Sequence, residues 1–357
     1  MSRPLAGPRP DEVPAEDLRL LTGRVESALG DLLADQLARW SEVDRRAAVP
    51  VQAVADLVAA GGKRLRPVFC LAGFLAGGGR PEDGEYAVRA ATALELLHAS
   101  ALIHDDVMDE ADERRGLPTV RTQHSSIHRA MRWQGDPDRY GESVAILAGD
   151  LAWVYADHLM ADLPAAVRQE WYDLRTELVA GQMLDVSAAT ELRPDVQLAS
   201  KVAVLKSGRY TVLRPLRLGA ALAGRADLHR PFQVYGEALG EAFQLRDDLI
   251  DVFGDRSLSG KPGQQDLRRP KMTLLLSIAV QQDERIRDLA RVGQVEALVA
   301  RLESSGARDL VEARIDRLLA EAHAAVATAN LTSPWREHLA ALATVIARPR
   351  EELSTPS

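Results

Sequence analysis

Two short acidic stretches, Asp105-Asp106-Val107-Met108-Asp109 and Asp247-Asp248-Leu249-Ile250-Asp251, repeat one pattern of three aspartates. A helix with 3.6 residues per turn places the first and third Asp of each triplet on one face. Carboxylates at this spacing repel one another, and their burial costs free energy, so a cation should compensate them. Mg²⁺ is usually held by one or two carboxylates together with substrate phosphates. The two triplets therefore predict a Mg²⁺-bridged diphosphate between two helices.

Apolar sequence precedes both triplets. Residues 94–103 lead into the first triplet and residues 238–245 into the second, and each run is apolar nearly all round. A solvated acidic helix end would not need such flanks, whereas a central helix would. The sequence thus predicts buried helices over 86–109 and 232–253. Aromatic residues make up only 4% of the chain, and no segment alternates with the period of a strand, so we expect an all-α fold.

The chain has 357 residues, of which 46% are hydrophobic, a length that allows one or two domains. No Gly/Ser-rich or charged linker divides it, and the two triplets need each other in one cavity, which favours a single domain over 18–348. The Pro- and acid-rich residues 1–17 and the residues 349–357 are expected to be disordered tails.

Charge and hydropathy exclude several classes of protein. The formal net charge is −8, and no Lys/Arg stripe with interleaved aromatics occurs, which argues against nucleic acid as a partner. No apolar stretch approaches the roughly 18 residues of a membrane-spanning helix, and the N-terminus lacks the apolar segment of a signal peptide. A single cysteine, Cys70, rules out a disulfide framework. These features predict a soluble cytoplasmic protein.

Basic residues accompany the first triplet. Arg114 and Arg115 follow it, and a planar guanidinium forks onto phosphate oxygens; the alternative is a surface ion-pair network with nearby acids. The stretch Gly61-Gly62-Lys63-Arg64-Leu65-Arg66-Pro67 joins two helical segments. There, Lys63 and Arg66 would share one side of the chain, and two glycines would admit an anion. Alone, this stretch is more typical of a simple turn.

Further polar residues stand in apolar or glycine-rich surroundings. His98 lies two turns before the first triplet and is either a core histidine or a phosphate donor. The polar, glycine-rich stretch 254–263 is either a mobile flap or an ordinary loop. Isolated polar positions, each of which could also be a helix cap or a buried hydrogen bond, are Gln182, Asp185, Lys206, Ser207 and Gln244; Lys261 and Lys271 border the long loop.

Taken in order, these motifs closely resemble those of the trans-isoprenyl diphosphate synthases. The resemblance runs from Gly61 to about Thr273, and residues outside that range carry no signature. Two departures stand out: Ser207 occupies a position where the family often has Thr, and Pro270 precedes Lys271 where Gly is common. The motifs that carry the resemblance are Gly-Gly-Lys-Arg-Leu-Arg-Pro, Asp-Asp-Val-Met-Asp with Arg-Arg-Gly-Leu-Pro-Thr, Gly-Gln-Met-Leu-Asp, Lys-Ser-Gly, and Phe-Gln-Leu-Arg-Asp-Asp-Leu-Ile-Asp.

The resemblance implies antiparallel helices around a central active-site cavity, and a homodimer. It implies head-to-tail condensation of isopentenyl diphosphate with an allylic diphosphate (dimethylallyl, geranyl or farnesyl). The residues implied for Mg²⁺ are Asp105, Asp106, Asp109, Asp247, Asp248 and Asp251. Those implied for the allylic diphosphate are Arg114, Lys206, Ser207, Gln244, Lys261 and Lys271. Those implied for isopentenyl diphosphate are Lys63, Arg66, His98 and Arg115, with Gln182 and Asp185 as further site residues.

Small residues before the first triplet predict the product length. In this family, aromatic side chains four or five residues before the first Asp stop the chain at the farnesyl length. Here those positions are Ser100 and Ala101, so the tail can go deeper, towards Leu97 or Trp153. We expect all-trans geranylgeranyl diphosphate (C20), with farnesyl (C15) or a longer product as alternatives.

Two other functions compete with this hypothesis. A class I terpene cyclase also ionises an allylic diphosphate, but its second metal motif mixes Asn, Ser or Thr with Glu, and it has no basic site for a second substrate. A non-catalytic subunit of a heteromeric synthase usually loses triplet aspartates or basic residues, and none is missing here.

Overall fold

The computed structural model describes residues 13–114, 116–191, 193–254, 267 and 272–348. Helices account for nearly all of this part of the chain, as expected from the sequence. The elements, in order, are α1 (Val13–Val43), α2 (Val49–Ala59), α3 (Leu65–Ala76), η1 (Pro81–Asp83), α4 (Glu85–Met108), β1 (Glu113–Arg114), β2 (Leu117–Pro118), α5 (Val120–Ala130), α6 (Pro137–Met160), α7 (Ala165–Glu191), α8 (Val196–Val202), η2 (Ala203–Leu213), α9 (Arg214–Leu222), η3 (Ala226–Leu228), α10 (His229–Phe253), α13 (Leu274–Gln282), α14 (Arg285–Arg291), α15 (Val295–Ser304), α16 (Ala307–Ala327) and α17 (Ser333–Ala347).

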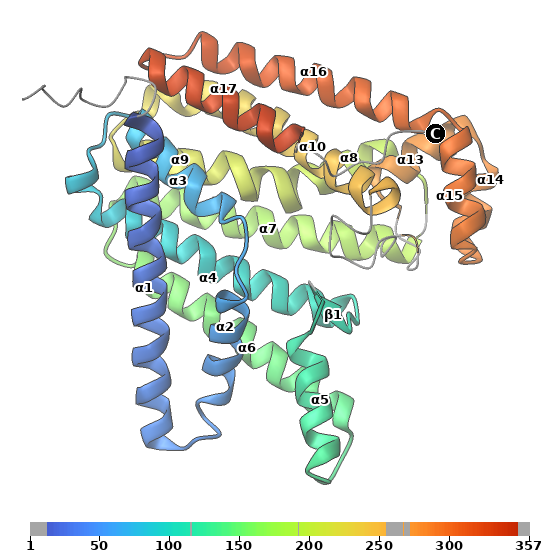
Figure 1. Ribbon diagram of the computed structural model, residues 1–357, viewed down its shortest axis with the longest axis horizontal. Coiled ribbons are helices and arrows are strands. Elements are labelled where there is room, and N and C mark those ends of the chain that lie inside the picture. The colour runs from blue at the N-terminus through green and yellow to red at the C-terminus, as the bar shows by residue number, and fades with distance from the viewer. Residues whose placement is uncertain (1–12, 115, 192, 255–266, 268–271, 349–357) are drawn as a thin grey trace, which may run out of the picture.

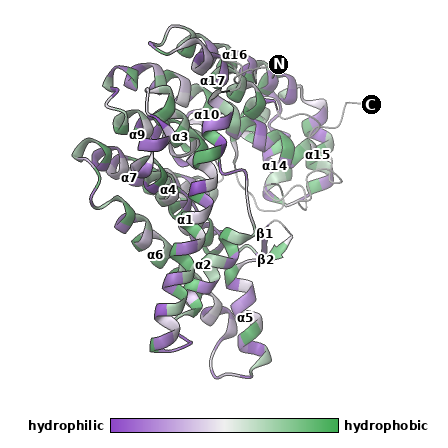
Figure 2. Ribbon diagram, turned by 60° about the vertical axis from the view of Figure 1, so that its left-hand side comes forward, coloured by the Kyte–Doolittle hydropathy of each residue, from purple (hydrophilic) through white to green (hydrophobic). Residues whose placement is uncertain are grey.

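The two helices that carry the triplets are central. Helix α4 packs against α1, α3, α6 and α9, and α10 packs against η2, α16 and α17. Both match the predicted spans closely, and most of their apolar side chains are buried. Figure 1 shows α16 and α17 crossing the top of the molecule over α10, and the C-terminal ends of α4 and α10 on the same side. The outer helices mix hydrophilic and hydrophobic residues, as Figure 2 shows.

The predicted boundary of the N-terminal tail is wrong. Helix α1 begins at Val13, so residues 13–17 belong to a helix. The prediction rested on the Pro- and acid-rich composition of residues 1–17, but Pro14 costs little in the first turn of a helix, where its missing amide hydrogen would have no partner. The negative charge of Glu16 in that turn also interacts favourably with the helix dipole. Leu18 and Leu21 then anchor α1 in the core.

A small β-ribbon interrupts the helices after the first triplet. Strands β1 and β2 pair in antiparallel fashion, with Glu113 opposite Pro118 and Arg114 opposite Leu117. Gly116 has φ = 74°, a left-handed conformation that glycine adopts without steric cost. The sequence did not predict this ribbon, because two-residue strands are too short to show an alternating pattern. Its consequence is that Arg114 is turned back towards α4.

Close backbone contacts fix the helices around the core. A Cβ placed on Gly73 of α3 would lie 2.2 Å from the carbonyl oxygen of Leu216 in α9, and one on Gly219 would lie 2.0 Å from the carbonyl oxygen of Cys70. Helices α3 and α9 therefore pack at a distance that only glycine allows. Cys70 is fully buried there, and burial raises the pKa of its thiol to about 12, consistent with a small core residue.

Candidate active site

The first triplet ends helix α4. Asp105 and Asp106 lie in its last turn, and Asp109 is its C-cap residue. Asp106 is buried, and the Arg114 guanidinium donates to its carboxylate, with Nε 3.0 Å from Oδ1 and Nη2 2.8 Å from Oδ1. Burial raises the pKa of the Asp106 carboxyl above its ordinary value, although the hydrogen bonds from Arg114 act in the opposite direction. The β-ribbon thus supplies one cation to this acidic helix end.

A second cation reaches the triplet from η2. Lys206 donates from Nζ to Oδ1 of Asp105 at 2.9 Å and to Oδ2 of Asp185 on α7 at 2.5 Å. Gln182, one turn before Asp185, donates from Nε2 to the same Asp105 oxygen at 3.0 Å. Two elements, η2 and α7, therefore converge on Asp105, and the predicted site residues Gln182, Asp185 and Lys206 lie together.

The second triplet lies near the end of α10. Asp248 is buried and accepts a hydrogen bond from Gln244 Nε2 at 2.9 Å. Ser207 Oγ donates to Gln244 Oε1 at 2.7 Å. The backbone amide of Leu275, in the first turn of α13, contacts the other Asp248 oxygen at 3.4 Å. Asp247, by contrast, is exposed. The predicted residues Ser207 and Gln244 are therefore joined to the second triplet.

Segment η2 connects the two triplets through adjacent residues. It is a π-helix, a rare conformation that is frequently associated with functional sites. Lys206 reaches the first triplet, and its neighbour Ser207 reaches the helix of the second. Both residues are isolated polar positions in the sequence. The sequence contains no sign, however, of the π-helix that turns these consecutive side chains towards two different helices.

Glycines allow η2 to lie directly against α7 and α10. A Cβ on Gly181 of α7 would be 2.6 Å from the backbone nitrogen of Lys206, and a Cβ on Gly240 of α10 would be 2.2 Å from the Cα of Gly208. Real Cβ atoms do not approach other atoms this closely, so both positions require glycine. No motif in the sequence marks Gly240 as part of the site, because its importance depends on Gly208, which lies opposite it in the fold.

Gly240→Ala should therefore push η2 away from α10. We expect a loss of about 1 to 3 kcal/mol in the free energy of unfolding, the usual cost of overpacking, and reduced activity because Lys206 and Ser207 move. Gly23→Ala is the matched control, since Gly23 lies within α1 and an added Cβ would meet no atom within 4 Å. This substitution should raise the free energy of unfolding by about 0.5 to 1 kcal/mol. Urea unfolding of both variants measures the difference. Equal effects would contradict the close packing.

The residues expected to bind isopentenyl diphosphate lie on two neighbouring helices and a loop. Arg66, in the first turn of α3, places its Cζ atom 4.3 Å from the centroid of the Tyr210 ring, and the His98 ring on α4 lies 6.2 Å from that ring. Lys63 is exposed in the loop before α3. Tyr210 of η2, which the sequence analysis missed, is buried, and burial raises the pKa of its phenol. Tyr210 thus lies between Arg66 and His98.

Several predicted residues fall elsewhere. Arg115, Lys261 and Lys271, and nearly all of the glycine-rich stretch 254–263, lie outside the residues that the structure describes.

Ser100 is fully buried, whereas Ala101 is partly exposed one turn before Asp105. Of the two expected chain-length residues, Ala101 is therefore the one whose side chain is accessible.

The donor set of the triplets fits a divalent ion that is shared with a phosphate. Within the described residues, no group of three or more His, Cys, Asp or Glu side chains is placed to hold a metal ion by itself. Asp105 and Asp106 instead face Lys206 and Arg114. All-oxygen donors suit Mg²⁺, which commonly takes only one or two carboxylates and completes its coordination with water and phosphate.

Fold and site together define the class of protein. The central helices α4 and α10, whose triplet regions are connected through η2, belong to the all-α isoprenoid synthase fold. The chain belongs to the polyprenyl synthetase family, whose model matches residues 49–302. It is accordingly a trans-prenyl diphosphate synthase, and thus a prenyltransferase. Among its described helices, none is both long enough and apolar enough to cross a membrane.

Curated relatives differ in the product that they are named for. An all-trans-nonaprenyl-diphosphate synthase (geranyl-diphosphate specific) from Rhodobacter capsulatus is 29% identical, over 76% of this chain and 81% of that protein. A geranylfarnesyl diphosphate synthase from Aeropyrum pernix is 31% identical, over 72% of this chain and 80% of that protein. These names establish the class of reaction and leave the product length open.

A solved structure covers almost the whole chain. The geranylgeranyl pyrophosphate synthase from Corynebacterium glutamicum, crystallised with isoprenyl diphosphate and magnesium, superposes with a TM-score of 0.84 at 34% identity. The match covers 96% of this chain and 100% of the other. The fold predicted from the sequence is thereby confirmed.

Proposed function

We propose that this enzyme is a Mg²⁺-dependent geranylgeranyl diphosphate synthase. It condenses isopentenyl diphosphate head to tail with dimethylallyl, geranyl and farnesyl diphosphates to give the all-trans C20 product. The observation that carries the proposal is the pair of aspartate triplets joined by Lys206 and Ser207. This arrangement sets carboxylates and donors on both sides of one site, as a metal-complexed diphosphate requires.

The polar residues divide into two groups in this proposal. The first group holds Mg²⁺ and the allylic diphosphate: Asp105, Asp106, Asp109, Asp247, Asp248, Asp251, Arg114, Lys206, Ser207, Gln244, Lys261 and Lys271, with Gln182 and Asp185 orienting Lys206 and Asp105. The second group holds isopentenyl diphosphate: Lys63, Arg66, His98 and Arg115. Tyr210 keeps Arg66 in place through its contact with the guanidinium.

The chemistry follows from these charges. Bound Mg²⁺ supplies neutralisation of the diphosphate, which makes it a better leaving group. Arg114 and Lys206 stabilise the negative charge that grows on the departing oxygen. The carbon–oxygen bond breaks, the double bond of isopentenyl diphosphate attacks the allylic carbon, and a proton leaves to form the new double bond. The released diphosphate is our proposed proton acceptor, and the apolar flank of α4 excludes water.

Product analysis tests this function directly. Purified protein with Mg²⁺, isopentenyl diphosphate and farnesyl diphosphate should yield C20 alcohol after phosphatase treatment, and no product when chelator removes the metal. Cyclic hydrocarbon from an allylic diphosphate alone would indicate a terpene cyclase instead. Condensation that appears only when a second chain is added would indicate a non-catalytic subunit.

The two substrate sites can be separated by lysine variants. Lys63→Ala should weaken the binding of isopentenyl diphosphate, and Lys206→Ala should weaken the binding of the allylic substrate. Each loss should be about 1.5 to 3 kcal/mol, the usual value for a lost charged hydrogen bond. Initial rates with each substrate varied in turn give the two KM values. Lys201→Ala, at an exposed lysine of α8, is the control and should change neither. Equal effects of both variants on both substrates would refute the assignment.

Exposed apolar side chains on α6 support a homodimer. Ile146, Leu147 and Val154 are 44%, 57% and 58% exposed, and large apolar side chains gathered on one helix favour burial against a partner. We propose a symmetric pair of chains in contact through α6, in the cytoplasm. Sedimentation equilibrium measures the oligomeric state.

A further inference from the structure

Arg64 has an unusual backbone conformation next to the loop that carries Lys63. Its φ is 47° and ψ is 35°, in the left-handed region, and only Glu110 and Arg132 share a positive φ among the described residues other than glycine. Bulky residues enter this region only where the surrounding structure holds them. Arg64 marks the point at which the chain leaves the Gly61-Gly62 turn and enters α3.

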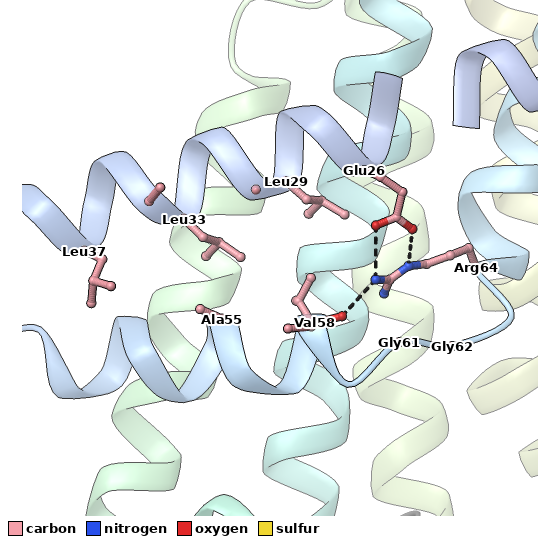
Figure 3. Close-up of a pocket in the computed structure, with 12 residues that line it drawn as sticks. Glu26, Leu29, Leu33, Leu37, Ala55, Val58, Gly61, Gly62 and Arg64 are labelled. Atoms are coloured by element: carbon pink, nitrogen blue, oxygen red, sulfur yellow. Dashed lines mark hydrogen bonds and ion pairs between the residues drawn. The ribbon is translucent and has the colours of Figure 1, made fainter. Parts of the chain in front are cut away.

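The Arg64 side chain holds three other elements. Nη1 lies 2.5 Å from Oε1 of Glu95 on α4, Nε lies 2.7 Å from Oε1 of Glu26 on α1, and Nη2 donates to the carbonyl oxygen of Val58 on α2 at 2.8 Å. Figure 3 shows the guanidinium between Glu26 and Val58, beside the glycine turn. The side chains of Arg64 and Glu95 are only 11% and 7% exposed. The guanidinium therefore ties the start of α3 to α1, α2 and α4.

A buried ion pair is weak evidence for stability, because the cost of desolvation offsets the attraction between the charges. Here one carboxylate oxygen of Glu95, Oε2, is buried without a hydrogen-bond partner, so the pair is not arranged for the largest stabilisation. Glu95 lies one helical turn before His98 on α4. Arg64 thus links the loop of Lys63 and Arg66 to the helix that presents His98.

A pocket borders the turn on the side of α1 and α2. This pocket of 520 Å³ lies between α1 and α2, and Gly61, Gly62 and Arg64 border it, together with apolar side chains such as Leu33 of α1 (Figure 3). A Cβ on Gly61 would meet no atom within 4 Å. On this side, the guanidinium of Arg64 contacts both Glu26 of α1 and the carbonyl oxygen of Val58 of α2.

We propose that Arg64 is a positioning residue for isopentenyl diphosphate. Through Glu95 and Glu26 it fixes the 61–66 loop relative to α4, so that Lys63, Arg66 and His98 meet one diphosphate without prior rearrangement of the loop. Arg64 itself does not contact the substrate, because its donors are already engaged with Glu26, Glu95 and Val58. This inference rests on the proposed function of the site.

Arg64→Asn tests the inference, because Asn tolerates the left-handed backbone but cannot reach the three partners. We expect the KM for isopentenyl diphosphate to rise at least about tenfold, with the KM for the allylic substrate changed less than about twofold. Amide hydrogen exchange of residues 61–66 should also become faster. Arg80→Asn, at an exposed arginine paired with Asp83, is the control and should change neither quantity.

Glu95→Gln provides the second variant, since it keeps the shape of the side chain and removes its charge. In a folded protein, Glu95→Gln should raise the KM for isopentenyl diphosphate and speed the amide exchange of residues 61–66. Arg64→Lys should bind isopentenyl diphosphate more tightly than Arg64→Asn does. Unchanged loop exchange with an unchanged KM would overturn the proposal, as would equal increases of both KM values. The exchange measurement needs no substrate, so failure of wild-type protein to condense the two diphosphates would refute the proposed function separately.

Discussion

Asp105→Ala should lower the turnover of condensation at least about a hundredfold while leaving the helical fold intact. In the proposed function the substitution removes a metal ligand, and it also leaves Lys206 with Asp185 as its single carboxylate partner, which would pull the lysine away from the diphosphate. The fold should persist, because removing one of three crowded carboxylates relieves repulsion along α4. Steady-state turnover and far-UV circular dichroism measure the two effects.

Asp112→Ala is the matched control for this variant. Asp112 lies just beyond the triplet, its side chain is 77% exposed, and it pairs with Arg121 rather than with the site. A surface pair of this kind contributes at most about 1 kcal/mol, so activity should remain near that of the wild type. Near-normal turnover of Asp105→Ala would remove the first triplet from the active site.

Ala101→Phe should shift the main product from C20 to C15 and retain condensation activity. Residue 101 lies one turn before Asp105 on α4, about 6 Å deeper along the helix axis, and it is only partly buried. A phenyl ring there would fill open space rather than a packed core, so the usual cost of overpacking, about 1 to 3 kcal/mol, should not apply in full. Chromatography of the dephosphorylated products gives the chain length.

Two outcomes would correct the product assignment. If Ala101→Phe still makes C20, residue 101 does not face the growing tail. If the wild type makes a product longer than C20, the floor of the tunnel is deeper than Leu97 or Trp153. Trp153 lies on α6 with its ring 6.0 Å from the Arg175 guanidinium of α7, and Leu97 is fully buried. Ala101→Ser, which adds one atom, should leave the chain length unchanged.

The sequence predicted the helices well, because they depend on local patterns, and the acidic site remains a prediction made from patterns of the same kind. The apolar runs before Asp105 and Asp247 identify buried helices, and the spacing of the aspartates places them on one face. Lys206 and Ser207 stood out for the same reason, since polar residues in apolar surroundings need partners.

The remaining features depend on contacts between distant segments, which no local pattern encodes. Tyr210 lies between Arg66 and His98 for two reasons. Segment η2 packs against α3, and the rotation of α4 about its axis turns His98 towards η2. Gly240 matters only because Gly208 lies opposite. The tail boundary failed for a local reason, since Pro14 is compatible with both a helix start and a disordered segment.

The ion pairs of Asp105 and Asp106 with Lys206 and Arg114 have a consequence for the order of binding. Before any ligand arrives, each of these carboxylates already has a cation, so entry of Mg²⁺ or diphosphate alone would leave one member of a pair without an opposite charge. In the proposed function, binding of both would let the carboxylates exchange their cations for the metal, and Lys206 and Arg114 would exchange their carboxylates for phosphate oxygens. Metal and diphosphate should therefore bind with positive cooperativity, each raising the affinity of the enzyme for the other by the same factor.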